Sequence, residues 1–250
     1  MKEIIRTENL EKYFGEMAAI HQVTVALEEG LFTSVIGPNG AGKTTLINLL
    51  SGYLRPDGGK VFFQGREITH LGPDQRVKIG ISRSFQVMNI FPRLTVFQNI
   101  LLPVLSRFEK TSSAFSSLGS QKDCVEEAEK ILGEVWLQKD RNVPAGQLSH
   151  GDQRLLELGI AVASNPRLCF LDEPSSGMNP IERIKVLELV KKLASERRTT
   201  FIIVEHDMDI VFSLSDWIVV MNRGEILAQG KPGEIRENKE VRDIYLGEEI

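Results

Sequence analysis

Three short apolar runs divide the chain, and each one ends at small, polar or acidic residues. The runs are LFTSVI at 31–36, RLCFLDE at 167–173 and TTFIIVEH at 199–206. Short runs of this length that are largely apolar are typical of strands that are buried on both faces. The pattern therefore predicts buried strands in these three places.

Helical spacing fills much of the sequence between these runs. The segment KTTLINLLSGY at 43–53 and the run IERIKVLELVKKLASE at 181–196 both predict helices, the second with Ile184, Leu187 and Val190 spaced three apart. Strands that alternate with helices indicate βαβ units and a parallel sheet.

The remaining stretches have different patterns. Residues 60–68 (KVFFQGREI) predict a hairpin strand and a turn, and residues 91–164 read as mainly helical. Within the helical stretch, residues 106–123 are rich in Ser and Lys, which indicates a surface loop or frayed helix, or equally a disordered insert without a role.

Composition narrows the class of protein without naming a function. Hydrophobic residues make up 42% of the 250 residues and charged residues 26%, as in ordinary globular proteins. The net charge of −4 does not favour nucleic acid as a partner. No run of about eighteen apolar residues occurs, so any membrane-spanning part must come from another chain.

The clearest chemical motif follows the first apolar run. Residues 37–44 (GPNGAGKT) fit the pattern GxxxxGK[ST] at every fixed position. Glycines let the backbone wrap around phosphates, and the following helix directs its positive N-terminus to the same place. Lys43 can reach the β- and γ-phosphates of a nucleotide, and the Thr44 hydroxyl can ligate Mg²⁺. A chance match in a glycine-rich turn is the alternative, and the flanking strand and helix argue against it.

An acidic pair, Asp172 and Glu173, closes the second apolar run. The carboxyl end of a strand in a parallel sheet is where ligands bind. We expect Asp172 to hold Mg²⁺, directly or through water, and Glu173 to orient and deprotonate an attacking water. The alternative is an ordinary solvated strand end that binds no ligand.

A third motif, LSHGDQ at 148–153, begins the predicted helix QRLLELGIAVAS about twenty residues before Asp172. Ser149 is a natural N-cap, and Gly151 permits close approach to the backbone. Taken alone, this motif reads as an ordinary capped helix.

Together, the three motifs resemble the ATP-binding subunits of ABC transporters over nearly the whole chain. The resemblance implies an α/β fold, with a RecA-like P-loop NTPase core, a mostly parallel sheet, an N-terminal antiparallel β part and an inserted helical subdomain. Residues 1–250 then form one ATP-binding domain, in which 1–90 and 165–250 make the nucleotide-binding core and 91–164 make the helical subdomain.

The resemblance also assigns roles to individual residues. It places Gln86 as a sensor of Mg²⁺ and the γ-phosphate and His206 as the switch histidine beside that phosphate. The nucleotide-binding set is Phe14, Gly37, Pro38, Asn39, Gly40, Ala41, Gly42, Lys43, Thr44 and Thr45. Tyr13 is an alternative to Phe14 for stacking on adenine, and either aromatic residue could simply be part of the core.

The signature motif of the family is usually LSGGQ, and here it is changed at two positions. Ser149, His150, Gly151 and Asp152 occupy it, so this chain has His and Asp in place of Gly and Gln. Asp152 is repulsive beside a phosphate unless it points away, although it suits the first turn of a helix. The loop SSGMN at 175–179 usually ends in Asp, and Asn179 weakens any ionic role there.

The implied chemistry is the hydrolysis of ATP, with Mg²⁺ as cofactor. Two ATP molecules are sandwiched in a head-to-tail dimer, in which the signature motif of one subunit covers the γ-phosphate bound to the other. The expected partners are a second ATP-binding subunit, identical or different, two transmembrane permease subunits and a solute-binding protein, with the chain peripheral on the cytoplasmic side of the inner membrane. The amino acid importers of this family pair two related but different ATPase chains, which favours a heterodimer.

The cargo rests on resemblance alone. GMNP at 177–180 and the stretch ILAQGKPGEIRENKEVRDIYLGEE at 226–249 resemble the ATPases of branched-chain amino acid importers. Urea-importer and lipopolysaccharide-export ATPases are near relatives. A non-transport ABC ATPase remains an alternative, as does a P-loop kinase or GTPase, which would lack LSHGD.

Overall fold

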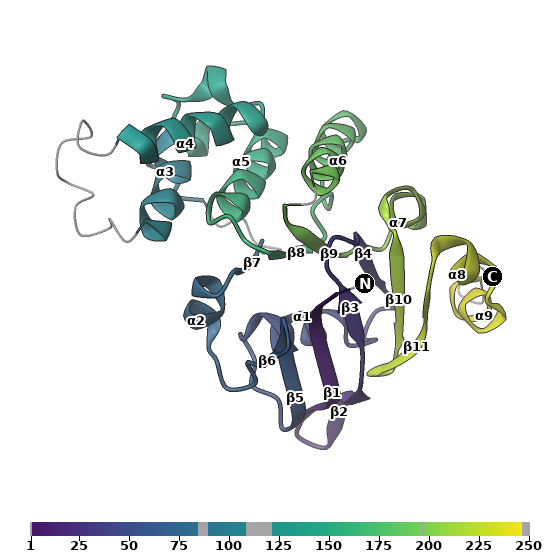
Figure 1. Cartoon of the computed structure of the whole chain (residues 1–250). Coiled ribbons are helices and arrows are strands. Elements are labelled where there is room, and N and C mark those ends of the chain that lie inside the picture. The colour runs from purple at the N-terminus through teal and green to yellow at the C-terminus, as the bar shows by residue number, and fades with distance from the viewer. Residues whose placement is uncertain (1, 85–89, 109–121, 197, 247–250) are drawn as a thin grey trace. The chain divides into compact units, whose positions relative to one another are not determined.

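A computed structural model describes residues 2–84, 90–108, 122–196 and 198–246. They divide into two compact units. Unit 1 consists of Met1–Ile79, Phe170–Glu173 and Thr200–Ile250, and unit 2 consists of Gly80–Cys169 and Pro174–Thr199. Figure 1 labels the elements of both units.

The first sheet of unit 1 is antiparallel and has the strand order β2-β1-β5-β6, with β3 also paired to β1. Its strands are β1 (Glu3–Phe14), β2 (Met17–Val23), β3 (Ala26–Glu28), β5 (Gly58–Phe63) and β6 (Arg66–Glu67). The expected antiparallel β part near the N-terminus is therefore confirmed, and 60–68 forms the expected hairpin.

The second sheet contains, in unit 1, the order β11-β10-β4-β9-β8, in which residues 170–172 of β8 belong to this unit. Its strands are β4 (Thr33–Ile36), β8 (Leu168–Asp172), β9 (Thr200–Val204), β10 (Trp217–Asn222) and β11 (Glu225–Gly230). The pairs β10–β4 and β4–β9 are parallel, whereas β10–β11 is antiparallel. Every residue of β4, β8 and β9 is buried, which confirms the three strands predicted from the apolar runs.

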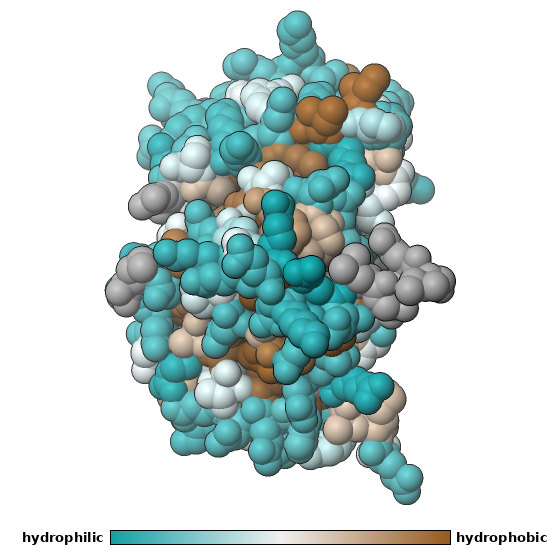
Figure 2. Space-filling model, turned by 90° about the vertical axis from the view of Figure 1, so that its right-hand side faces the viewer, coloured by the Kyte–Doolittle hydropathy of each residue, from teal (hydrophilic) through white to brown (hydrophobic). Residues whose placement is uncertain are grey.

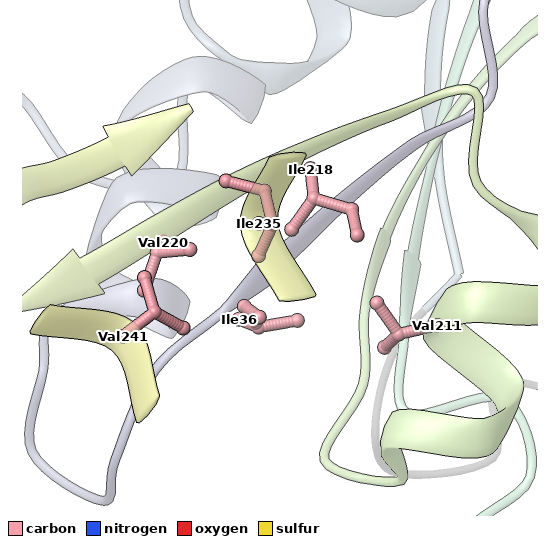
Figure 3. Packing of buried hydrophobic residues seen from close by; sticks show 6 residues of the cluster. All are labelled: Ile36, Val211, Ile218, Val220, Ile235 and Val241. Carbon is pink, nitrogen blue, oxygen red and sulfur yellow. The ribbon is translucent and has the colours of Figure 1, made fainter. Parts of the chain in front are cut away.

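The helices of unit 1 are α1 (Lys43–Ser51), α2 (Pro73–Lys78), α7 (Met208–Leu214), α8 (Pro232–Glu237) and α9 (Lys239–Leu246). The last three pack on the second sheet. Figure 3 shows the contact, in which Val211 of α7, Ile235 of α8 and Val241 of α9 meet apolar residues of the strands. The strand residues of this cluster are Ile36, Ile218 and Val220. Burial of these side chains holds the C-terminal helices against the sheet.

A buried arginine joins α1 to the segment before α2. The Arg76 side chain is 1% exposed, and its guanidinium donates to the carbonyls of Leu49 and Leu50 at the end of α1 and to that of Ile68. Burial lowers the pKa of Arg76 to about 10, which leaves it charged at neutral pH. A cation suits this place because the C-terminal carbonyls of a helix carry partial negative charge.

Unit 2 is mainly helical. It contains β7 (Ile81–Arg83), α3 (Val96–Arg107), α4 (Lys122–Glu134), α5 (His150–Ala163), α6 (Pro180–Ser195) and the short 3-10 turns η3 (Gln138–Asp140) and η4 (Ala145–Gln147). The buried side chain of Asn99 accepts from the N–H of Phe91 and donates to the carbonyl of Thr95, which fixes the turn before α3. Of the Ser-rich stretch 106–123, residues 109–121 lie outside the described residues.

The helix predicted at 181–196 is present as α6, in which only Val190 of the three apolar positions spaced three apart is fully buried. Its buried face consists of Val186, Leu189, Val190 and Leu193, whereas Ile184 is 58% exposed. A spacing of three residues advances 300° around a helix of 3.6 residues per turn, so a strict three-residue stripe leaves the buried face after two steps. The observed face combines steps of three and four.

No helix in the described part of the chain is both long enough and apolar enough to cross a bilayer. Figure 2 shows one face of the surface, on which hydrophilic side chains predominate and hydrophobic side chains form smaller patches.

Candidate functional site

The glycine-rich loop joins the end of β4 to the start of α1 in unit 1. Gly42 caps α1 with a φ of +99°, and a Cβ placed there would lie 2.6 Å from the carbonyl oxygen of Ala19. Both the left-handed backbone and the close approach therefore require glycine at this position. The first turn of α1 then begins with the hydrogen bond from Leu46 N–H to the Gly42 carbonyl.

Lys43, the first residue of α1, turns its side chain back over this loop. Its Nζ donates to the carbonyl oxygens of Gly37 at 2.6 Å and Pro38 at 3.0 Å, and the residue is 6% exposed. Burial lowers the pKa of Lys43 below its ordinary value, and the charges of Glu173 and Asp172 act against this lowering. The loop thus holds a shielded cation, with two carboxylates close enough to affect its titration.

The acidic pair lies at the carboxyl end of β8. Asp172 is the last residue of the strand and is 2% exposed. Glu173 follows with a φ of +47°, a conformation unusual for a residue with a side chain, and its N–H donates to the carbonyl of Val204. Backbone strain of this kind gathers at functional sites, where the surrounding structure holds it in place.

His206 meets Glu173 directly. It follows the end of β9, and its Nε2 lies 2.7 Å from Oε1 of Glu173. A carboxylate accepts only, so the ring nitrogen is the donor in this pair when Glu173 is ionised. The two side chains are therefore oriented by one another, as a base and its positioning group would be.

One cavity of about 510 Å³ brings most of the predicted residues of unit 1 together. Its volume lies in the range of small-molecule sites. The predicted residues that line it are Phe14, Asn39, Gly40, Ala41, Gly42, Lys43, Thr44, Thr45, Glu173 and His206. Gly37, Pro38 and Asp172 do not line it, although Pro38 lines a neighbouring cavity of about 320 Å³.

The two aromatic candidates separate in the structure. Phe14 lies at the end of β1, is 47% exposed and lines the cavity, whereas Tyr13 does not line it. Phe14 is therefore the aromatic residue that is placed to contact a ring bound there.

Four lining residues were missed from the sequence: Met17, Ala18, Ala19 and Arg223. The first three open β2, and Arg223 lies in the turn between β10 and β11. That turn is tied to the glycine-rich loop, because Gly224 N–H donates to the carbonyl of Ala41. No motif marks these residues; only the pairing of strands brings them to the cavity.

A further cavity of unit 1, of about 460 Å³, contains none of the predicted residues. It lies among Ala26, Glu28, Leu31, Ser215, Asp216, Trp217, Lys231 and Pro232. The P-loop cavity, and not this one, combines a buried cation, backbone N–H groups and a carboxylate–histidine pair.

The residues around the loop fit Mg²⁺ bound together with phosphates. The described residues hold no cluster of three or more His, Cys, Asp or Glu that could bind a metal by themselves. Magnesium commonly takes one or two protein oxygens and completes its shell with phosphate and water. The hydroxyl of exposed Thr44 and the carboxylate of Asp172 can supply such oxygens. Gln86, the third predicted ligand, lies outside the described residues.

The signature residues form a separate cluster in unit 2. Ser149 caps α5 by accepting from the N–H of Asp152, as expected, and His150 is exposed. The Asp152 carboxylate pairs with Lys185 of α6 at 2.7 Å. Asn179 caps α6 by accepting from the N–H groups of Ile181 and Glu182, which gives it a structural task there.

Comparison with known proteins agrees with these motifs. Residues 20–176 match the family described as ABC transporter, and residues 225–250 match the one described as branched-chain amino acid ATP-binding cassette transporter. The high-affinity branched-chain amino acid transport ATP-binding protein BraF of Pseudomonas aeruginosa is 39% identical over 255 residues, which cover 99% of each protein.

Solved structures show the same likeness. The ADP conformation of MJ1267, an ATP-binding cassette of an ABC transporter, is 35% identical, with a TM-score of 0.84 over 99% of this chain and 100% of that one. A dimeric post-hydrolysis state of the ATP-binding cassette MJ0796, bound to ADP and Pi, is 27% identical, with a TM-score of 0.77 over 92% of this chain and 99% of that one.

Proposed function

The chain belongs to the ABC transporter family of ATP-hydrolysing proteins, and from this premise we propose that it powers the uptake of branched-chain amino acids through a separate membrane permease. The observation that carries the proposal is the P-loop cavity, where Lys43, Glu173 and His206 meet beside the glycine-rich loop. The cargo is proposed from the likeness to BraF and from the match of residues 225–250 to the importer family.

Binding of ATP uses groups that the loop already presents. The N–H groups of the loop and the N-terminus of α1 receive the phosphates. Lys43 exchanges its two carbonyl acceptors for the β- and γ-phosphates, and Phe14 stacks on the adenine. Thr44, Asp172 and Gln86 would hold Mg²⁺, which would supply positive charge against the phosphates.

Hydrolysis then requires a water aligned with the γ-phosphate. Glu173 accepts the proton of this water as it attacks, and His206 holds the carboxylate in place through the hydrogen bond from Nε2. Because the strained backbone of Glu173 is tied to β9 through Val204, the carboxylate is fixed before ATP arrives.

The working assembly is a head-to-tail pair of ATP-binding subunits. In this proposal residues 91–164 form the helical subdomain, and Ser149, His150, Gly151 and Asp152 of one subunit face the γ-phosphate bound to the other. Two permease subunits and a solute-binding protein complete the importer, and the chain lies peripherally on the cytoplasmic side of the membrane. The dimeric, ADP- and Pi-bound state of MJ0796 supports the pairing.

The test of the proposal removes the positive charge of Lys43 from the cavity. Lys43→Ala should lower ATP binding and hydrolysis at least a hundredfold, because a buried charge-assisted contact to two phosphates is lost. Lys60→Ala removes an exposed lysine of β5 in the same unit and should change neither quantity. ATPase activity of Lys43→Ala close to that of the unchanged chain would overturn the assignment of this cavity.

A further inference from the structure

The start of α5 is covered by two charged side chains of α6 in unit 2. We call the set Ser149, Gly151, Asp152, Glu182 and Lys185 the signature face. Glu182 reaches Gly151, and Lys185 reaches Asp152. Neither α6 residue belongs to the motif itself: Glu182 lies 31 positions after Gly151 in the sequence, and Lys185 lies 33 positions after Asp152.

Glu182 accepts a hydrogen bond from a backbone N–H group that an incoming anion would also use. Its Oε1 accepts from the N–H of Gly151 at 3.3 Å. Its stem packs against the same residue, because a Cβ on Gly151 would lie 2.8 Å from Cγ of Glu182. The glycine thus makes room for this glutamate, and the carboxylate takes the place at the helix N-terminus that suits a negative charge.

Asp152 is held by two partners on its other side. Its Oδ1 lies 2.7 Å from Nζ of Lys185, and its Oδ2 accepts from the Ser149 hydroxyl at 2.8 Å. Burial raises the pKa of Asp152, but the hydrogen bonds from Lys185 and Ser149 outweigh it and hold the pKa below the ordinary value. Asp152 is therefore ionised at neutral pH, and Lys185 neutralises a charge that repels phosphate.

The net charge of the signature face is negative and therefore repels an incoming anion. Two carboxylates, Asp152 and Glu182, stand against the one ammonium of Lys185, which leaves one negative charge in this set. In the proposed function this face must receive the γ-phosphate bound to the second subunit. The carboxylate of Glu182 and that phosphate then compete for the N–H of Gly151.

We propose that Glu182 and Lys185 are positioning residues of opposite effect on the ATP-bound dimer: Glu182 holds the Gly151 N–H until the γ-phosphate of the partner displaces it, and Lys185 holds Asp152 clear of that phosphate. This inference rests on the proposed function, because it takes the signature face to contact the nucleotide of a second copy of this chain. In this inference Glu182 sets the ATP concentration at which the dimer closes.

The test measures how much Mg-ATP is needed for half-maximal dimer, by analytical ultracentrifugation of the Glu173→Gln chain, in which hydrolysis is blocked. Glu182→Gln keeps the shape and an acceptor oxygen but removes the charge, and it should lower this concentration about threefold to tenfold. Lys185→Met leaves Asp152 uncompensated and should raise the concentration by a similar factor.

Matched variants separate this effect from a general change of charge. Glu188→Gln and Lys191→Met make the same two changes at exposed positions of the same helix and should shift the concentration less than twofold. Lys185→Arg should restore most of the loss seen with Lys185→Met. Asp152→Gln combined with Lys185→Met should also recover it, because the carboxylate that needed Lys185 is gone.

The outcomes distinguish the inference from the proposal beneath it. Binding of a fluorescent ATP analogue to the monomer should be equal in all variants, so a change in dimer formation reports on the signature face. Loss of structure cannot explain the results, since it would weaken the dimer in both variants, whereas opposite shifts are expected. If Glu173→Gln binds ATP and stays monomeric at every concentration, the sandwich of two copies is wrong. If it dimerises, but Glu182→Gln and Lys185→Met shift together or no further than their controls, the inference is wrong and the proposed function stands.

Discussion

Replacing Glu173 with Gln changes one atom at the centre of the proposed chemistry. Gln has the same shape, tolerates the left-handed backbone as well as Glu does, and can still bond to His206 across the 2.7 Å contact. Proton abstraction, however, needs the carboxylate. Loss of general-base assistance typically lowers a rate by about two to four orders of magnitude, which corresponds to about 2.7–5.4 kcal/mol of transition-state stabilisation.

The affinity for ATP should change much less than the rate, because two electrostatic effects oppose each other. Removing the Glu173 charge takes away repulsion toward the γ-phosphate. It also removes the carboxylate that does more than Asp172 to raise the pKa of Lys43, while Asp172 remains. We expect the dissociation constant of ATP to stay within about threefold of that of the unchanged chain.

The assay is the release of phosphate under saturating Mg-ATP, with the dissociation constant measured separately by a fluorescent analogue. The chain offers a matched control: His21 Nδ1 and Glu225 Oε1 form an exposed pair at 2.8 Å outside the P-loop cavity. Glu225→Gln should hydrolyse ATP at the normal rate. If Glu173→Gln did so as well, Glu173 could not be the base, and the mechanism would have to be abandoned.

Three further predictions concern the surroundings of the site. Arg76→Met should lower the free energy of unfolding by about 3 kcal/mol or more in urea denaturation, because buried carbonyls at the end of α1 lose their donor; a change below about 1 kcal/mol would contradict this. Asn179→Ala should cost about 1 kcal/mol by the same method while Asn179→Asp costs less, since only Ala removes the cap of α6. The affinity for ATP should fall as the pH rises through the alkaline range toward the lowered pKa of Lys43, because bound phosphates raise that pKa and binding then takes up a proton; an affinity that is constant up to the ordinary pKa of 10.5 would speak against the role of Lys43.

Local sequence patterns predicted those elements whose physical requirement is met by residues close together in the sequence. The buried strands at 33–36, 168–172 and 200–204 were predicted from short runs that are largely apolar, and Gly42 and Lys43 were predicted from a motif with fixed spacing. In each case the physical requirement, burial on both faces or a backbone that wraps a phosphate, is met within about ten residues.

What the sequence did not show depends on contacts between distant residues. Arg223 and Ala19 reach the cavity only through strand pairing and the bond between the β10–β11 turn and the P-loop. The departure at Asp152 looked unfavourable beside a phosphate, because its partner Lys185 lies 33 residues further along the chain. The buried face of α6 combines steps of three and four residues, which the three-residue spacing of its apolar positions does not reveal.

The most direct test of the whole account is transport itself. The ATPase pair that contains this chain is reconstituted with the permease subunits in vesicles that hold Mg-ATP on the side of this chain. The uptake of labelled leucine is then followed in the presence of the solute-binding protein. We predict uptake that requires ATP and that is lost when Lys43→Ala replaces the unchanged chain. Leucine uptake that is equal with Lys43→Ala, or ATP-driven uptake of urea in place of leucine, would contradict the account.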